Sequence, residues 1–174
     1  MMWSIDIEMK GLNTITEKKG LLLKDSVSCR RALKTDLPEV PALYAQPGLD
    51  EGKCLSLPDA ECLFERMSRY PDYQIHVAVR DGKIVGTFAL LIMDNLGHLG
   101  APSAVIEGVA VAPEFQGQGV GKEMMQYAFR ICRGKGCFKA VLSSNMKRKR
   151  AHAFYESLGF ERHGYSCKIR GNIE

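Results

Sequence analysis

The fold of this chain is decided by the stretch Gln116-Gly117-Gln118-Gly119-Val120-Gly121-Lys122. It follows an alternating apolar run, residues 105–112, and a break at Pro113-Glu114, and it leads into a segment of helical periodicity. Glycine at alternate positions lets the backbone approach a ligand closely with exposed N–H groups. A following helix adds unpaired N–H groups and the positive end of its dipole. The stretch therefore predicts a phosphate-binding loop with Lys122 beside it, and a glycine-rich turn without a ligand is the alternative.

The two best-known phosphate loops do not account for this stretch. The dinucleotide fingerprint Gly-x-Gly-x-x-Gly, counted from Gly117, fails because its third glycine is replaced by Lys122. The Walker loop fails because Gln116 and Glu123 stand where it needs a glycine and a hydroxyl. The pattern that the stretch does match is Gln/Arg-x-x-Gly-x-Gly/Ala, at Gln116, Gly119 and Gly121.

Length and composition indicate one ordinary globular domain. The chain has 174 residues, of which 45% are hydrophobic and 25% charged. A net charge of +4 suits a small polyanionic ligand but is too low for the basic footprint of a nucleic-acid-binding protein. No apolar run is long enough to span a membrane, and the mixed charges near the N-terminus do not match a signal peptide.

The cysteines indicate free thiols in a reducing cytoplasm. They form no Cys-x-x-Cys pair and no Cys/His cluster with zinc spacing, so we expect no metal site. Cys132 and Cys137, the closest pair, are expected to be core or near-surface thiols. The six cysteines are Cys29, Cys54, Cys62, Cys132, Cys137 and Cys167.

The periodicity along the chain predicts an α+β domain on a mixed sheet. The dipeptide Asp81-Gly82 predicts a tight hairpin, and Pro41 is expected to bend or shorten the first helix. Residues 1–25 are expected to form an N-terminal extension, as a short edge strand or partly disordered, outside a domain at 26–174. We expect strands at 26–33, 73–80, 83–92, 104–112, 137–143 and 160–169, and helices at 37–44, 58–70, 120–132 and 151–158.

A second motif lies between the last two predicted strands. It consists of Asn145 after a strand, then Ala151-His152 and Phe154-Tyr155 on a helix, and then Gly159-Phe160. With the glycine loop, in this order and spacing, residues 26–170 resemble the GNAT superfamily of N-acetyltransferases. The resemblance implies a GNAT fold. Such a fold has a central mixed, mostly antiparallel sheet flanked by about four helices, with splayed strands forming the acetyl-CoA cleft.

The resemblance also implies acetyl-CoA as the acetyl donor and a set of residues that hold it. Free backbone of the strand near residues 109–111 would pair with the pantetheine arm, and Gly108 would suit a bulge there. The basic run at residues 147–150 is either a solvated helix start or, in part, a contact with the outer phosphates. A nucleic-acid patch is the third option. The implied donor-binding residues are Val109, Ala110, Val111, Gln116, Gly117, Gln118, Gly119, Val120, Gly121, Lys122, Asn145, Arg148 and His152.

Two residues match catalytic positions of the family. Glu107 matches a glutamate that acts as general base, and by alternation it should share a face with Val105, Val109 and Val111, where partial burial would strengthen it as a base. A solvent-facing glutamate paired with a lysine is the alternative. Tyr155 matches a tyrosine that acts as general acid beside the sulfur, and a core aromatic is its alternative.

The acceptor is expected to be a primary amine of a small molecule, attacked directly in a ternary complex. The two motifs are similar to those of aminoalkylphosphonate and glucosamine-phosphate acetyltransferases. Protein N-terminal or lysine acetylation and a non-catalytic CoA-binding regulatory module remain open. We expect no membrane or nucleic-acid partner, and the resemblance implies a homodimer. Candidate acceptor-site residues are Asn95, His98 and Tyr165.

Overall fold

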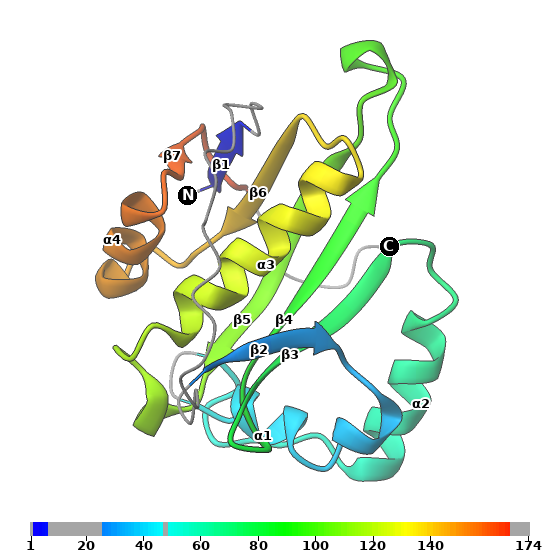
Figure 1. The fold of residues 1–174 in the computed structure, drawn as a ribbon, viewed down its shortest axis with the longest axis vertical. Helices are drawn as coiled ribbons and strands as arrows, with labels where there is room; N and C mark the ends of the chain where they lie inside the picture. The colour runs from blue at the N-terminus through cyan, green and yellow to red at the C-terminus, as the bar shows by residue number, and fades with distance from the viewer. Residues whose placement is uncertain (1, 7–25, 47–48, 168–174) are drawn as a thin grey trace, which may run out of the picture.

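The chain folds around one mixed sheet flanked by helices (Figure 1). The computed structural model describes residues 2–6, 26–46 and 49–167, and the counts that follow refer to these. The seven strands are β1 Met2–Asp6, β2 Ser28–Arg31, β3 Tyr73–Arg80, β4 Lys83–Met93, β5 Ser103–Val111, β6 Lys139–Ser143 and β7 Glu161–Arg162. The four α-helices are α1 Val40–Tyr44, α2 Leu57–Met67, α3 Val120–Gly134 and α4 Lys149–Ser157.

The strand order confirms the predicted fold class. It runs β2-β3-β4-β5-β6-β1-β7. Neighbours are antiparallel except β5 and β6, which are parallel. A mostly antiparallel sheet with a single parallel pair requires the crossover that α3 provides between β5 and β6. None of the helices in the described ranges is both long and apolar enough to cross a lipid bilayer.

Local sequence signals set several boundaries as expected. Asp81 and Gly82 have φ of 50° and 77°, the left-handed pair that a two-residue hairpin turn requires. Ser56 caps α2 by accepting a hydrogen bond from the Asp59 amide. Gly159, with φ of 90°, ends α4 in the conformation that glycine adopts most readily. These boundaries depend on residues close together in the chain, and the sequence therefore predicts them well.

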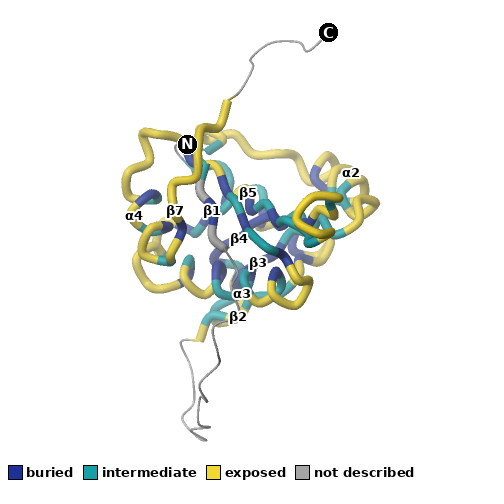
Figure 2. Tube along the Cα trace, turned by 90° about the horizontal axis from the view of Figure 1, so that it is seen from above, coloured by how far each residue is buried: buried dark blue, intermediate teal, exposed yellow. Residues whose placement is uncertain are grey.

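Helix α3 supplies the main core against one face of the sheet. It lies across this face in Figure 1, and the central strands beneath it are largely buried in Figure 2. Its stripe of buried side chains packs on Phe88, Leu90 and Ile106 of the sheet. Helices α1 and α2 are not part of this main core. Helix α1 packs against the sheet in two smaller clusters, one with Val77 and one with Ala110. The buried residues of α3 are Val120, Met124, Met125, Ala128 and Cys132.

One expectation about the ends of elements is confirmed and two are wrong. Pro41 shortens the first helix, because α1 covers Val40–Tyr44 in place of the expected 37–44 and the proline lies in a first turn whose amides have no helical partner. Strand β1 lies between β6 and β7 and is therefore not an edge strand. The last strand is only Glu161–Arg162, because it pairs with β1 through Trp3 and Ser4 alone. The rest of the expected extension, residues 7–25, lies outside the described residues.

A neutral histidine is buried beneath α3. His76 is 3% exposed, stacks on Phe88 at 5.0 Å between ring centroids, and meets the edge of Tyr127 at 5.4 Å. Its Nδ1 atom has no hydrogen-bond partner among the residues that the structure describes. Burial, with a smaller contribution from the Arg31 charge, lowers the pKa of His76 from 6.5 to about 4. The folded protein therefore holds this ring uncharged at neutral pH.

His76 should make the protein less stable in mild acid. The unfolded chain protonates this residue below pH 6.5, whereas the folded chain resists protonation down to about pH 4. Stability is therefore lost as the pH falls between these values, by up to about 3 kcal/mol. We expect urea unfolding to show that His76→Phe flattens this dependence and that the exposed His163→Gln leaves it intact. Equal slopes for wild type and His76→Phe would contradict the assignment.

Candidate functional site

The site begins where strands β5 and β6 separate. Their parallel pairing covers Ser103–Ile106 against Lys139–Leu142 and ends there, although β5 continues to Val111. Beyond Ile106, the edge of β5 that faces β6 has no strand partner in the described chain. Backbone groups of a strand need hydrogen-bond partners, so this unpaired edge can accept an extended ligand.

A β-bulge lies at the start of the unpaired edge. Thr87 pairs with Ala110 and Ala89 pairs with Glu107, so three steps along β5 match two along β4. Gly108, at φ of 58°, lies within the extra step. The expected bulge at this glycine is therefore present.

The direction of the backbone past the bulge follows from one hydrogen bond. The Ala112 amide donates to the Val85 carbonyl at 2.9 Å, so Ala110 and Ala112 direct their backbone groups toward β4. By alternation, Val109 and Val111 direct theirs toward the gap between β5 and β6. The Val111 carbonyl there accepts a hydrogen bond from Gln116 Nε2 at 3.1 Å. The Val109 backbone and the Val111 amide thus face the gap.

The bulge places Glu107 on the face opposite the one we predicted. Ile106 packs in the cluster under α3, and Val109 and Val111 pack against that same cluster. Glu107 therefore faces the α1 side of the sheet and does not share a face with the two valines, because the extra residue inverts the alternation. Its side chain is also exposed and lacks the expected partial burial. The carboxylate and the side chains of Val109 and Val111 thus lie on opposite faces of β5, and the unpaired backbone lies at its edge.

The glycine loop connects β5 to the N-terminus of α3. Gly117 and Gly119 have φ of 76° and 85°, so the loop requires glycine at both positions. Helix α3 begins at Val120, and the first helical hydrogen bond comes from the Glu123 amide. The preceding amides of the helix have no helical acceptor and are therefore available to an anion. Gly121 serves a different purpose, because a Cβ there would lie 3.0 Å from Phe154 Cζ on α4.

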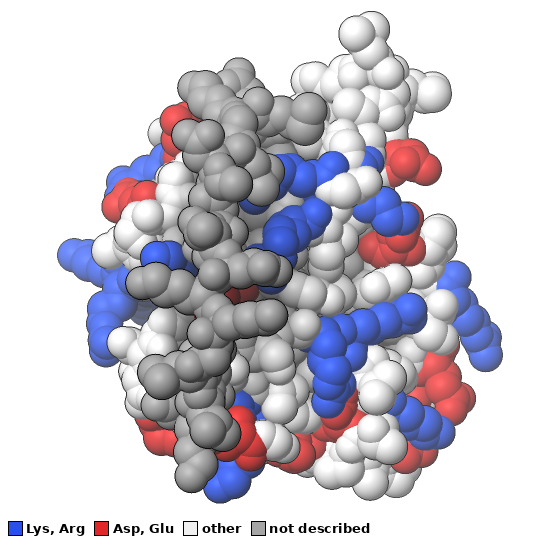
Figure 3. Space-filling model, viewed as in Figure 1, with Lys and Arg blue, Asp and Glu red and all other residues white. Residues whose placement is uncertain are grey.

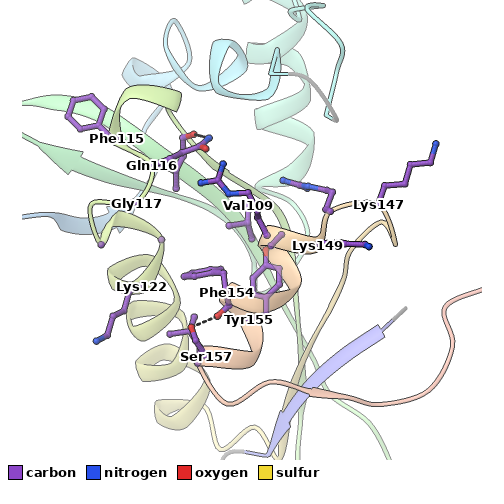
Figure 4. Close-up of a pocket in the computed structure, with 17 residues that line it drawn as sticks. Val109, Phe115, Gln116, Gly117, Lys122, Lys147, Lys149, Phe154, Tyr155 and Ser157 are labelled. Carbon is purple, nitrogen blue, oxygen red and sulfur yellow. Dashed lines mark hydrogen bonds between the residues drawn. The ribbon is translucent and has the colours of Figure 1, made fainter.

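A groove of about 760 Å³ joins these parts (Figure 4). It runs from the unpaired edge of β5 past the glycine loop and the start of α3 to α4. Among the predicted residues it contains Val109, Val111, Gln116, Gly117, Gly119, Gly121, Lys122, Arg148 and Tyr155. The sequence reasoning missed Phe115, Ala151, Phe154, Ser157 and Leu158. Lys147, Lys149 and Arg150, which it weighed as phosphate contacts without choosing them, also line the groove. Most of these lie on α4, whose first turn begins two residues earlier than expected.

The groove is strongly basic. Five cations line it, and none of the described residues that line it is acidic. Basic side chains gather over α4 in Figure 3. Cations at a helix start oppose the helix dipole, so their presence at α4 favours a bound anion over a stabilising role in the helix. The five are Lys122, Lys147, Arg148, Lys149 and Arg150.

Tyr155 lies in the wall of the groove. Its ring packs against Phe154 and Phe160, and the residue is only 7% exposed. Burial raises the pKa of the Tyr155 phenol, and the nearby Arg148 charge lowers it by less. The hydroxyl is therefore protonated at neutral pH and can donate a hydrogen bond or a proton. The core-aromatic role that we weighed for this residue coexists with its place in the groove.

The other predicted donor-binding residues lie around the groove without lining it. Ala110 and Val120 are buried in the core. Gln118 supports the loop from outside, because it accepts from Arg80 and donates to the Glu114 carbonyl.

Asn145 and His152 are linked to each other. Asn145 is exposed, its side chain accepts a hydrogen bond from the Lys147 amide, and its carbonyl lies 2.9 Å from His152 Nε2. His152 is buried and does not line the groove, although the resemblance implied a contact with the donor. The pair shapes the turn that leads into α4.

The acceptor-site candidates are not brought together by the fold. Asn95 donates to the Ala101 carbonyl within the β4–β5 loop. His98 stacks on Phe138 at 3.9 Å. Tyr165 is 90% exposed, after β7. Tyr73 lies close enough to Glu107 to be affected by its charge. Burial raises the pKa of the Tyr73 phenol, and the Glu107 carboxylate raises it further by a smaller amount.

A model of a protein family matches the part of the chain that forms the groove. The model of the acetyltransferase (GNAT) family matches residues 40–160, which include the glycine loop, the bulge and α4. The chain belongs to this family. The acetyl donor of GNAT acetyltransferases is acetyl-CoA, and the groove suits it. An unpaired strand edge can hold the amide-bearing arm, loop amides the diphosphate, and five cations the phosphate charge.

Curated relatives are similar over part of their length. The GNAT chain is 39% identical over 88 residues to the glucosamine 6-phosphate N-acetyltransferase of Trypanosoma brucei brucei, across 51% of this chain and 58% of that enzyme. It is 31% identical over 91 residues to the aminoalkylphosphonate N-acetyltransferase of Salmonella typhimurium, across 52% and 58%. The chain thus spans just over half the length of these relatives.

A solved structure extends the likeness to the whole fold. A putative acetyltransferase from Agrobacterium tumefaciens is 33% identical, with a TM-score of 0.77, and the match covers 83% of this chain and 99% of that one. The predicted GNAT fold is therefore confirmed well beyond the two sequence motifs.

The cations of the groove should bind CoA through charge. We expect Lys149→Ala to weaken CoA binding by about threefold to tenfold, because a partly screened contact with a phosphate is lost. The loss should shrink as salt rises from 50 to 500 mM in isothermal titration calorimetry. Lys34→Ala is the matched control, since Lys34 pairs with Glu61 and Glu65 outside the groove. Equal affinity for Lys149→Ala and wild type at low salt would contradict this role.

Proposed function

We propose that the protein is an acetyl-CoA-dependent N-acetyltransferase that acts on a primary amine of a small molecule by direct attack in a ternary complex. The observation that carries the proposal is the bulge, which places Glu107 on one face of β5 and the groove-lining Val109 and Val111 on the other, with the unpaired edge between them. The donor and the amine can then approach one another from opposite sides of the sheet. The curated relatives named above act on small amines, which supports this acceptor class.

Three tasks in the reaction fall to residues of this chain. Backbone amides that face the gap, near Val109, can donate to the thioester carbonyl as charge develops on its oxygen. Glu107 can accept a proton from the bound ammonium, directly or through water, from the α1 face, and the neutral amine that forms then attacks the thioester carbonyl. Tyr155 can donate a proton to the departing thiolate on the α4 side. Acetyl-CoA supplies the activated acetyl group.

Tyr155→Phe tests the general acid. It keeps the ring packing against Phe154 and Phe160 but removes the proton donor. We expect kcat to fall about 100-fold while the KM for acetyl-CoA stays within about twofold. Tyr127→Phe, at a half-buried position of α3 outside the groove, is the control and should match wild type. Unchanged kcat in Tyr155→Phe would remove the role, whatever the amine.

A panel of acceptors tests the function itself. Release of free CoA thiol should be measured with glucosamine 6-phosphate, aminoalkylphosphonates, aminoglycosides and unrelated peptides. We expect turnover with at least one small amine, and a loss of about 100-fold or more in kcat/KM for Glu107→Gln. Turnover only with peptides would instead favour a protein acetyltransferase. Tight acetyl-CoA binding without transfer to any amine would favour a non-catalytic CoA-binding module.

We also propose a cytoplasmic homodimer that binds no nucleic acid. The six cysteines are all free thiols in the structure, which suits a reducing compartment. Both Cys132 and Cys137 are buried. Light scattering on the purified protein measures the mass that decides the oligomeric state. Negligible RNA affinity at moderate salt is the expected result of a binding assay.

A further inference from the structure

A tyrosine outside the groove packs directly on the bulge. Tyr44, the last residue of α1, joins two core clusters on the α1 side of the sheet. A Cβ added to Gly108 would lie 3.1 Å from Tyr44 Oη and 3.2 Å from its Cε1. The ring therefore fills the space that a side chain at the bulge would need. Tyr44 is not among the residues that line the groove.

The hydroxyl of Tyr44 lies beside the strand opposite the bulge. Burial raises the pKa of the Tyr44 phenol, and the fully buried side chain of Thr87 is close enough to lower it by less. The Thr87 hydroxyl donates to the His76 carbonyl at 2.9 Å. Thr87 pairs with Ala110, two residues after Gly108. The phenol thus packs between α1 and β4 beside the bulge.

The same end of α1 contacts the glycine loop. Gln46, two residues after Tyr44, accepts a hydrogen bond from Gln116 Nε2 at 3.2 Å. Gln116 also donates to the Val111 carbonyl, on the gap side of β5. Gln46 is itself oriented by a 2.7 Å hydrogen bond to the Leu43 carbonyl. One short helix end therefore contacts both the bulge and the loop.

The bulge needs support from this face. On its other edge β5 has lost its partner β6, so no ladder of hydrogen bonds fixes the extra residue there. Residue 108 is a glycine, the residue type with the most backbone freedom, and it lies between Glu107 and Val109. A small rotation at this point would move the carboxylate and the ligand-facing backbone relative to one another. A rigid ring pressed against Gly108 opposes that rotation.

We propose that Tyr44 is a positioning residue for acetyl transfer, which fixes the bulge at Gly108 and so holds Glu107 and the Val109 backbone in register. The proposal rests on the proposed function. Tyr44 lies outside the groove, and it acts through the bulge. Burial raises the pKa of its phenol above the ordinary value, so the ring that presses on Gly108 stays uncharged at neutral pH.

Single substitutions separate positioning from general stability. Tyr44→Leu should lower kcat about tenfold to 100-fold, because a small misplacement of reacting groups has an effect of this size. Tyr44→Phe keeps the ring on Gly108 and should restore kcat to within about fivefold of wild type. Tyr127→Leu is the matched control, since this half-buried tyrosine of α3 packs on His76 away from the groove. It should lower the melting temperature but leave kcat unchanged.

A double-mutant cycle tests the contact itself. Gly108→Ala should lower kcat partly by pressing on the Tyr44 ring. If Tyr44 acts on the bulge, the loss in Tyr44→Leu/Gly108→Ala is smaller than the product of the two single losses. A loss equal to that product would overturn the proposal. So would a loss of kcat in Tyr127→Leu as large as in Tyr44→Leu.

Acetylation assays on the wild-type protein show whether the proposed function fails independently of the role of Tyr44. If no amine is acetylated, the proposed function fails, and CoA affinity then tests Tyr44 on its own. Tyr44→Leu should weaken CoA binding by about fivefold or more in calorimetry, because the Val109 backbone is displaced. Tyr127→Leu should bind as wild type does. Equal affinities for wild type and Tyr44→Leu in that case overturn the positioning role.

Discussion

The structure depends on the way strand β5 leaves its parallel partner. Pairing with β6 ends at Ile106, and one extra residue enters β5 at Gly108. Unpaired backbone groups inside a protein are costly unless something binds them. The strand is therefore held on its other side, by β4 along its length and by Tyr44 at the bulge. Its open edge is left to a ligand, and the remaining parts of the groove are arranged around that edge.

Charge and helix geometry act together at the far end of the groove. The first turn of α3 offers unpaired amides, and the first turn of α4 carries consecutive cations. Cations there cost stability in the isolated protein, because they oppose the helix dipole. Gly121 lets Phe154 approach α3 closely, so the two helix starts border one groove. Binding of a polyanion offsets the unfavourable charge, which favours a ligand such as CoA.

Much of the fold could be predicted because its signals are local. The hairpin at Asp81-Gly82, the apolar stripe of α3 and the glycine stop at Gly159 each depend on residues within a few positions. The position of β1 between β6 and β7 could not be predicted in this way. Pairing between distant strands depends on the whole sheet, and a five-residue strand carries too little pattern to choose its neighbours.

Some features of the candidate site could likewise be predicted from local sequence, and others depend on how distant elements pack. The sequence alone determined the glycine loop, the motif that contains Tyr155 and hence the family, because spacing within one segment requires specific residue types. Tertiary structure decided the face on which Glu107 lies, because a single extra residue inverts strand alternation. It also decided that Tyr44, some sixty residues earlier in the chain, packs on Gly108. Contacts of this kind arise only when separate elements pack, and no local pattern records them.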